Sequence, residues 1–205
     1  MSKLDIRQFS GDVLPTGGAF DGYIRKLSEN EFALVQNHFI RLDRDTLYHR
    51  FGSSVSDELL VRHVDSMRDP DATIFGCCIL GRIRGVAELR HFGSGRNRKA
   101  EAALTVERGY RDLGLGKALM AAMIDEASRI GLREIHVCFD VRDSHMRRIV
   151  EPFQTSSCFE DTDCVARISL EECEQGGRVK ADGGGDVPDL MGSTRKSGAQ
   201  SIPAR

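Results

Sequence analysis

A glycine-containing turn at the start of a helix-like segment constrains this chain most: the run RGYRDLGLGKALM spans residues 108–120. Glycine costs roughly 1 kcal/mol relative to alanine inside a helix. Gly114 and Gly116 are therefore unfavourable unless something approaches the backbone closely. A helix N-terminus has unpaired N–H groups and a partial positive charge, which Arg111 and Lys117 would reinforce. The run predicts an anion site. A turn that merely packs tightly, with both cations solvated, is the alternative.

The spacing excludes two common phosphate-binding turns. A P-loop needs glycine, four residues, then Gly-Lys and a hydroxyl residue, whereas this chain has Arg111 at the first position and Ala118 at the last. A dinucleotide-binding turn needs a third glycine or alanine where Leu119 stands. What remains is Arg-x-x-Gly-x-Gly, between a strand ending at Val106 and an alanine-rich helix.

Composition narrows the class of protein. With 205 residues, 40% hydrophobic and 29% charged, the chain can build one domain with a substantial core. A net charge of −2 and the absence of tryptophan favour neither nucleic acid nor a membrane surface as partner. The N-terminus has no signal-peptide pattern and no segment reaches membrane-spanning length, so we expect a cytoplasmic protein.

Cysteine spacing predicts reduced, mostly buried thiols and no metal site, since no CxxC pair occurs. Cys138, within an apolar strand, is expected in the core. We expect an N-terminal extension at residues 1–19, one domain at 20–172 and a disordered tail at 173–205, which is rich in Gly, Ser, Lys and Arg. The basic residues between Arg82 and Lys99 favour a solvated face over a nucleic-acid patch.

Hydrophobic periodicity predicts the order strand, two helices, three strands, helix, strand, helix, strand. Capping patterns at Ser28 and Ser56 start the first two helices, the first of which is expected to end by Gly52. The later helices are expected over 115–130 and, more briefly, over 143–152. Such a chain predicts an α/β or α+β domain, in which a mixed sheet carries helices on both faces.

The turn, with its flanking strand and helix, resembles the pyrophosphate-binding signature of the GNAT superfamily of acetyl-CoA-dependent N-acetyltransferases. LYHRFGS (residues 47–53) and KAEAALTVERGYRDLGLGKALM (99–120) are also similar to the GNAT domains of Pat-type bacterial protein-lysine acetyltransferases. The resemblance covers roughly residues 20–172. It implies a mainly antiparallel central sheet flanked by helices, and acetyl-CoA as the co-substrate with no metal.

The resemblance also assigns the cofactor site. Backbone N–H groups of the turn would hold the diphosphate, and the strand before it would pair with the pantetheine arm. The implied cofactor-binding residues are Leu104, Thr105, Val106, Arg111, Asp112, Leu113, Gly114, Leu115, Gly116, Lys117 and Ala118.

Two glutamates are candidates for the base that deprotonates an acceptor amine. Glu101 matches the usual position in the family and is preferred, and Glu88 matches the other common position. Either carboxylate could instead be a solvated charge or a structural ion pair. The backbone N–H of Val106 or a neighbour would stabilise the oxyanion.

The chain departs from the family pattern after residue 142. Many members place a tyrosine general acid on the helix there, but the tyrosines here are Tyr23, Tyr48 and Tyr110, and Asp143 replaces an asparagine. Ser144, His145 or a water is left to protonate the thiolate. The usual end of that helix is replaced by EPFQTSSCF (residues 151–159).

The resulting expectation is an N-acetyltransferase that transfers acetyl directly to a primary amine in a ternary complex, with a protein lysine preferred to a small amine. The alternatives are a non-catalytic or weakly active acetyl-CoA-binding regulatory module, and an interaction domain without cofactor. The sequence leaves open whether the protein is a monomer or a dimer.

Overall fold

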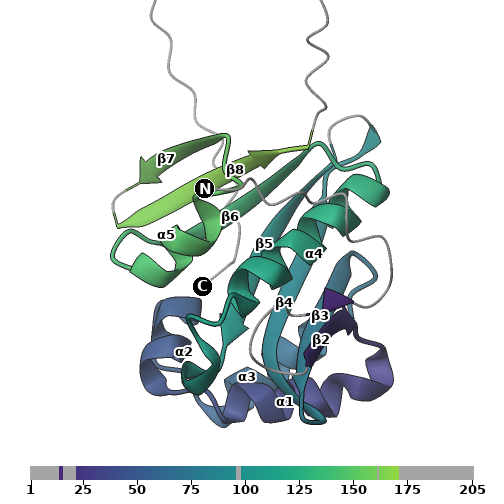
Figure 1. Ribbon diagram of the computed structural model, residues 1–205, viewed down its shortest axis with the longest axis vertical. Coiled ribbons are helices and arrows are strands. Elements are labelled where there is room, and N and C mark those ends of the chain that lie inside the picture. The colour runs from purple at the N-terminus through teal and green to yellow at the C-terminus, as the bar shows by residue number, and fades with distance from the viewer. Residues whose placement is uncertain (1–13, 16–21, 96–97, 161, 171–205) are drawn as a thin grey trace, which may run out of the picture. The chain divides into compact units, whose positions relative to one another are not determined.

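The structure, a computed structural model, describes residues 14–15, 22–95, 98–160 and 162–170. Its centre is an eight-stranded sheet in the order β1-β2-β3-β4-β5-β6-β8-β7 (Figure 1). Every neighbouring pair is antiparallel except β5 and β6, so the expected mixed, mainly antiparallel sheet is confirmed. The strands are β1 (Leu14–Pro15), β2 (Gly22–Lys26), β3 (Ala72–Ile79), β4 (Arg82–Phe92), β5 (Lys99–Val106), β6 (Glu134–Asp140), β7 (Ser156–Glu160) and β8 (Asp163–Ser169).

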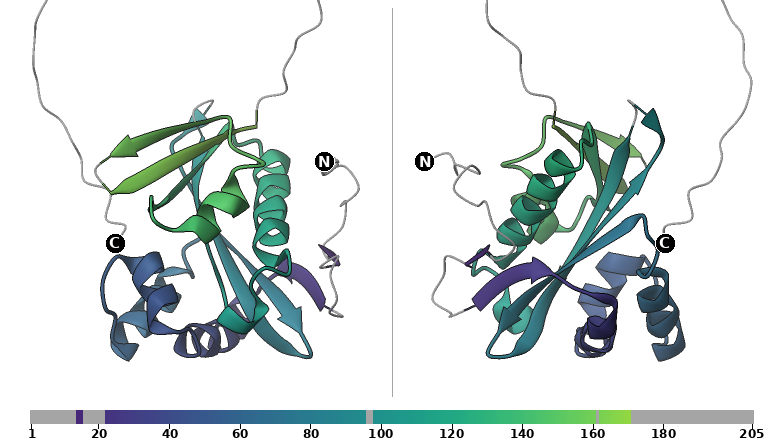
Figure 2. Two further views of the ribbon diagram at one scale, coloured as in Figure 1. Left: turned by 60° about the vertical axis from the view of Figure 1, so that its left-hand side comes forward. Right: turned by 90° about the vertical axis from the view of Figure 1, so that its right-hand side faces the viewer.

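Helices cover both faces of the sheet, as expected (Figures 1 and 2). One core forms between the sheet and α4 with α5, and a second core forms on the other face beneath the helices near the N-terminus. The helices are α1 (Phe32–Ile40), α2 (Arg44–Phe51), α3 (Asp57–Ser66), α4 (Leu115–Arg129) and α5 (Ser144–Val150), with short 3-10 turns at Glu29–Glu31 and Arg108–Tyr110.

Local capping explains where the first helices begin and end. The Ser28 capping box is present, as is the Ser56 cap, whose hydroxyl accepts the Leu59 N–H. The single helix expected up to Gly52 is wrong, because the chain breaks before Asp43, whose carboxylate caps α2 by accepting the Thr46 N–H at 3.1 Å. Gly52 does end α2, in a left-handed conformation (φ 69°) that favours glycine.

Two expectations about the strands were wrong: the number of strands at the end of the domain and the burial of Cys138. The expected order ends with one helix and one strand, but an additional strand, β7, lies between α5 and β8 and pairs with β8 at the edge of the sheet. Cys138 is exposed rather than buried, because side chains alternate along β6: Ile135, Val137 and Phe139 face the core, whereas Cys138 faces the other side.

The two terminal segments named from composition mostly lie outside the described residues. Of the extension at 1–19, only the two residues of β1 are described, and they pair with β2. The tail at 173–205 lies wholly outside them. Within the ranges that the structure describes, every helix is too short or too polar to cross a membrane.

Candidate active site

The central geometric feature of the site is the divergence of β5 from β6. The two strands pair only from Lys99 to Glu101 on β5, although β5 continues to Val106 and β6 to Asp140. Beyond Glu101, the side of β5 that faces away from β4 has no strand against it in the described part of the chain. The backbone of Leu104, Thr105 and Val106 lies on this open edge, as the resemblance implies.

The open edge leads into a helix N-terminus without a side-chain cap. Gly114 is the N-cap of α4, and the first intrahelical bond runs from the Ala118 N–H to the Gly114 carbonyl at 3.0 Å. The N–H groups of Leu115, Gly116 and Lys117 therefore have no partner within the helix. Aligned N–H groups with a helix dipole behind them suit an anion such as a diphosphate.

Each glycine of the turn also has a structural reason. Gly114 adopts a φ of +85°, which disfavours other residues. A Cβ on Gly116 would lie 2.5 Å from Cδ1 of Ile149, so the contact between α4 and α5 leaves no room for a side chain at this position unless Ile149 moves. The tight-packing alternative therefore accounts for Gly116, and it is compatible with an anion site at the same N-terminus.

The charged residues of the turn differ in their surroundings. Arg111 is only partly exposed: its Nε donates to the Val106 carbonyl at 3.3 Å, and its Nη2 contacts the hydroxyl of Thr46 on α2. Asp112 has a left-handed backbone (φ 58°) and pairs with Arg148 of α5 at 3.4 Å. Lys117 is exposed, which leaves its ammonium available to an anion.

The remaining candidates in the turn can contribute only through their backbone. Leu115 is buried, and Leu113 and Ala118 are partly buried against the core beneath α4. Their side chains therefore stabilise the fold, while their N–H groups lie at the beginning of the helix.

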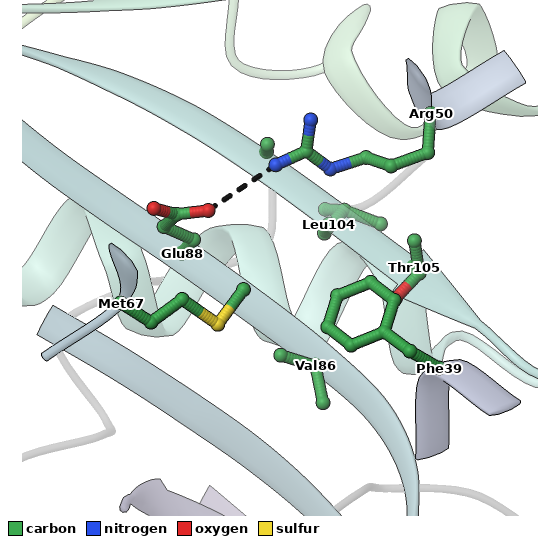
Figure 3. A pocket seen from close by; sticks show the side chains of 8 residues that line it. Phe39, Arg50, Met67, Val86, Glu88, Leu104 and Thr105 are labelled. Atoms are coloured by element: carbon green, nitrogen blue, oxygen red, sulfur yellow. Dashed lines mark hydrogen bonds and ion pairs between the residues drawn. The ribbon is translucent and has the colours of Figure 1, made fainter. Parts of the chain in front are cut away.

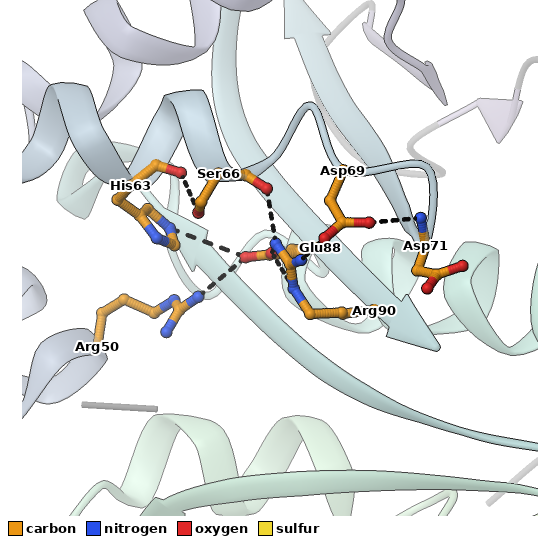
Figure 4. Close-up of polar contacts among 7 residues, drawn as sticks. All are labelled: Arg50, His63, Ser66, Asp69, Asp71, Glu88 and Arg90. Atoms are coloured by element: carbon orange, nitrogen blue, oxygen red, sulfur yellow. Dashed lines mark hydrogen bonds and ion pairs between the residues drawn. The ribbon is translucent and has the colours of Figure 1, made fainter. Parts of the chain in front are cut away.

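Two arginines and a histidine surround Glu88, as Figure 4 shows. Its carboxylate is buried and lies 2.8 Å from Arg90 Nη2, 3.2 Å from Arg50 Nη2 and 3.8 Å from His63 Nε2. Burial, with the nearby charge of Arg50, lowers the pKa of His63 to about 4, so this imidazole is neutral near pH 7. The structural ion pair that was an alternative for Glu88 is what the structure contains.

Glu101 has different surroundings. It lies opposite Arg90 of β4 and opposite His136 of β6, at the last position where β5 and β6 pair. Cross-strand partners share a face, so Glu101 and Glu88 point to the same side of the sheet. The Glu101 side chain is half-buried and makes no side-chain hydrogen bond or ion pair with the described residues. A carboxylate without such partners stands where the two strands separate.

A group of buried polar side chains, which sequence reasoning missed, fixes the end of β5. His38 of α1 is fully buried, with Nε2 2.9 Å from the Thr105 hydroxyl and Nδ1 3.5 Å from Glu107. Burial opposes ionisation of Glu107, but the nearby His38 and the hydrogen bonds from Arg84 and Arg41 lower the pKa of its carboxyl to about 2. The only sequence signal was a histidine on the apolar face of a helix.

A small pocket lies on the same face of the sheet, between β4, β5 and the helices that cover them (Figure 3). It is a shallow depression: the empty space of about 140 Å³ includes open solvent, and the side chains leave no interior room for a water molecule. The lining combines apolar walls with Glu88 and Arg50, and consists of Phe39, Arg50, Met67, Val86, Glu88, Ala103, Leu104 and Thr105.

No tyrosine lies on α5 to act as a general acid. The ring of Tyr110 stacks on Arg84, while Tyr23 and Tyr48 are exposed on β2 and α2. Asp143 caps α5 by accepting the N–H groups of His145 and Met146, each at 3.0 Å.

The basic residues between Arg82 and Lys99 do not form one solvated face. Arg84 pairs with Glu107, Arg90 pairs with Glu88, and Lys99 pairs with Glu134. Arg96 lies outside the described residues.

Comparison with solved structures gives the same fold at low sequence identity. The GNAT domain of Streptomyces lividans PAT superposes with a TM-score of 0.61 at 16% identity, covering 72% of this chain and 90% of that one. The yncA protein of Salmonella typhimurium, solved with its cofactor acetyl-CoA, has a TM-score of 0.57 at 16% identity, with 75% and 96% covered. The ribosomal-protein-S5-alanine acetyltransferase of Vibrio fischeri has a TM-score of 0.58 at 11% identity, with 74% and 94% covered.

A search of curated protein sequences gave no match. The model of the acetyltransferase (GNAT) family matches residues 38–149, which include the end of α1, all of α2, α3 and α4, the open edge of β5 and most of α5. The match covers more than half of the chain, and the fold and its helix N-terminus agree with it. The chain belongs to the GNAT family of acetyltransferases.

Proposed function

We propose that this protein transfers an acetyl group from acetyl-CoA to a primary amine, directly within a ternary complex. One observation carries the proposal: the open edge of β5 leads into the uncapped N-terminus of α4. An extended amide-containing arm can pair with a strand edge, and a diphosphate can bind unpaired helix N–H groups. Acetyl-CoA combines these two chemical features.

The residues of the turn fit this co-substrate. The N–H groups of Leu115, Gly116 and Lys117 would bind the diphosphate, and the backbone of Leu104 to Val106 would pair with the pantetheine arm. Bound acetyl-CoA supplies an activated thioester. The protein's own contribution is to align that group with the amine at the divergence of β5 and β6, with a backbone N–H of Val106 or a neighbour available for the oxyanion.

Glu101 is the base in this proposal. An acceptor amine is protonated near neutral pH and must lose a proton before it can attack. Glu101 lies at the strand divergence and has no side-chain partner in the described part of the chain, so its carboxylate can accept that proton directly or through a water. Both oxygens of Glu88 are instead directed at Arg90 and Arg50, which suits a structural carboxylate better than a base.

A second candidate function is a module that binds acetyl-CoA without transferring the acetyl group. The observation in its favour is that α5 carries no tyrosine to protonate the thiolate. Binding without turnover would identify this function, because both candidates share the acetyl-CoA site and differ in the acetyl transfer.

The test measures free-thiol release from acetyl-CoA with a panel of primary amines, for the wild type and for Glu101→Gln. General-base catalysis contributes about 10²- to 10⁴-fold. We therefore expect kcat to fall at least 100-fold while the Kd for acetyl-CoA stays unchanged. Glu151→Gln, at an exposed glutamate just after α5, is the matched control and should keep full activity. Unchanged turnover in Glu101→Gln would show that the base assignment is wrong.

A further inference from the structure

His136 of β6 is paired with Glu101 in the last residue pair that joins β5 to β6. Paired residues on neighbouring strands share a face of the sheet, and the strands are about 4.8 Å apart. Ala100 and Ile135, which alternate with them, are fully buried in the core beneath α4. Glu101 and His136 therefore point away from α4, toward the face on which α2 contacts β5 and β6.

Two contacts fix the ring of His136. Its Nε2 is hydrogen-bonded to Glu134, which lies on the same face of β6 and also accepts from Lys99 Nζ at 2.8 Å. The Phe92 ring packs against the imidazole in a T-shaped arrangement, with centroids 6.1 Å apart. The contacts with Lys99 and His136 hold the pKa of the Glu134 carboxyl below its usual range. Because an ionised carboxylate can only accept a hydrogen bond, Nε2 carries the proton, and Nδ1 is the acceptor in the neutral ring.

Nδ1 of His136 is free to take up a proton. It makes no hydrogen bond within the ranges that the structure describes, and the side chain is 25% exposed. The imidazole and Glu101 are not directly bonded to each other, but a water can bridge two side chains on adjacent strands. A ring that is oriented by a carboxylate at one nitrogen and open at the other is suited to proton transfer.

Charged groups of both signs surround this ring. Those on the same face come from β4, β5, β6, β8 and α2, and are Arg90, Lys99, Glu101, Glu134, Arg167 and His49. Arg90, the cation opposite Glu101, is already paired with Glu88. Arg167, the partner of His136 on β8, is exposed, so solvent screens its charge. Glu101 therefore has His136 beside it as the group with which it can exchange a proton.

A carboxylate alone is a poor acceptor for the proton of an ammonium group. In free side chains, lysine ammonium groups titrate near about pH 10.4, histidine near 6.5 and glutamate near 4.3. A proton on a carboxylate is therefore held weakly near neutral pH and returns easily to the amine. An imidazole holds it about 100-fold better. Proton transfer is most efficient when the accepting group titrates near the working pH.

We propose that His136 is a proton relay: it takes from Glu101, through a water, the proton that the acceptor amine loses. This role rests on the proposed acetyl transfer and adds a second residue to its base. An N–H bond of the ammonium group breaks and the proton bonds to an oxygen of Glu101. Glu101 then passes a proton to the water, which gives one of its own to His136 Nδ1. The imidazolium is stabilised by Glu134 until it releases the proton to solvent, and no oxidation or reduction takes place.

The first test compares the wild type with His136→Gln, using acetyl-CoA and the amine of the panel that is acetylated fastest. We expect kcat at pH 8 to fall at least 10-fold, while the KM for acetyl-CoA stays unchanged. The advantage of the wild type should shrink by about 10-fold between pH 8 and pH 5.5, because a protonated imidazole cannot accept a proton. The amine titrates equally in both reactions, so the ratio of the two rates isolates His136.

Two further variants complete this test. Glu134→Gln still accepts the Nε2 proton but lacks the charge, so kcat should fall less than in His136→Gln. His91→Gln is the matched control and should behave as wild type. His91 is 20% exposed and lies 3.5 Å from Asp71, but it is paired with Ala100 and so faces the other side of the sheet. An unchanged kcat in His136→Gln would overturn the relay, as would a ratio of rates that is the same at both pH values, which is what a purely structural role gives.

A measurement without turnover separates the relay from the proposed function. In ¹⁵N-labelled protein, the imidazole nitrogen shifts report which nitrogen of His136 carries the proton. We expect the Nε2–H form at pH 8. We also expect Glu101→Gln to move the protonation of Nδ1 to lower pH, because a neighbouring negative charge is removed. If both are observed but no amine is acetylated, the transferase function is contradicted and the pairing of His136 with Glu101 is not. An Nδ1–H form, or a titration that Glu101→Gln leaves unchanged, would overturn the relay whatever the turnover.

Discussion

Three glutamates on β4, β5 and the turn after β5 differ in the side chains around them, and this difference assigns their roles. Glu107 is held by Arg41 and Arg84, at 2.9 and 2.8 Å, and Glu88 is held by Arg90 and Arg50. Glu101 has no such partner among the described residues. A carboxylate fixed by arginines stabilises the fold, whereas one without partners at the strand divergence remains able to take up a proton.

His63 makes the stability of the protein depend on pH. Its ring lies between Arg50, Glu88 and Arg90 and against the rings of Phe39 and Phe51. Burial lowers its pKa from 6.5 to about 4 in the folded protein. Between these values the unfolded chain binds more protons than the folded one, so the free energy of unfolding falls as the pH falls.

We expect His63→Gln to reduce the loss of stability between pH 6.5 and pH 4, measured by urea denaturation. One histidine contributes a slope of up to about 1.4 kcal/mol per pH unit in this range. His38, whose pKa burial also lowers, adds to the slope in both proteins, so the difference between them isolates His63. Identical slopes in the two proteins would contradict this account of His63.

At the scale of elements, the contact between α4 and α5 depends on one glycine. Gly116 is buried in the first turn of α4, and its missing side chain makes room for Ile149 of α5. The same residue contributes one of the unpaired N–H groups that would bind the diphosphate. Gly116 is therefore expected to affect both the packing of α4 on α5 and the binding of the cofactor. A second substitution, at Ile149, can distinguish the two effects.

Gly116→Ala should lower the free energy of unfolding by about 1–3 kcal/mol, because the new methyl group overlaps Ile149 Cδ1. The double variant Gly116→Ala with Ile149→Val removes that atom and should recover most of the stability in urea denaturation. If the methyl group disturbs only packing, the Kd for acetyl-CoA recovers as well. If the Kd stays weakened in the stable double variant, the backbone at Gly116 is needed by the ligand itself. Failure of the double variant to regain stability would contradict the packing explanation.

At the scale of the whole molecule, the features set by neighbouring residues were predictable. The Ser28 and Ser56 caps, the glycine turn and the strand ending at Val106 all depend on residues close in the chain, and all are present. The break before Asp43 was missed because the apolar spacing continues through it, although Asp43 provides a local cap.

Features that depend on distant pairing could not be predicted. β7 became a strand only because β8 supplies its partner, and Cys138 is exposed because of the face of β6 on which it falls. The contacts of His38 with Thr105 and of Arg50 with Glu88 join residues 67 and 38 positions apart. The resemblance was therefore enough to predict the turn as the cofactor site. The ion pairs of Glu88 could be recognised only once the three-dimensional structure was known.

The most direct test of the central claim is a titration of ¹⁵N-labelled protein with acetyl-CoA, followed by amide chemical shifts. The account predicts that the largest shifts fall on Leu104 to Val106 and on Leu113 to Lys117. Amides of β2, on the far side of β3 and β4 from the open edge of β5, should shift little. Absence of binding, or shifts confined to residues away from the β5 edge and the α4 N-terminus, would contradict the account.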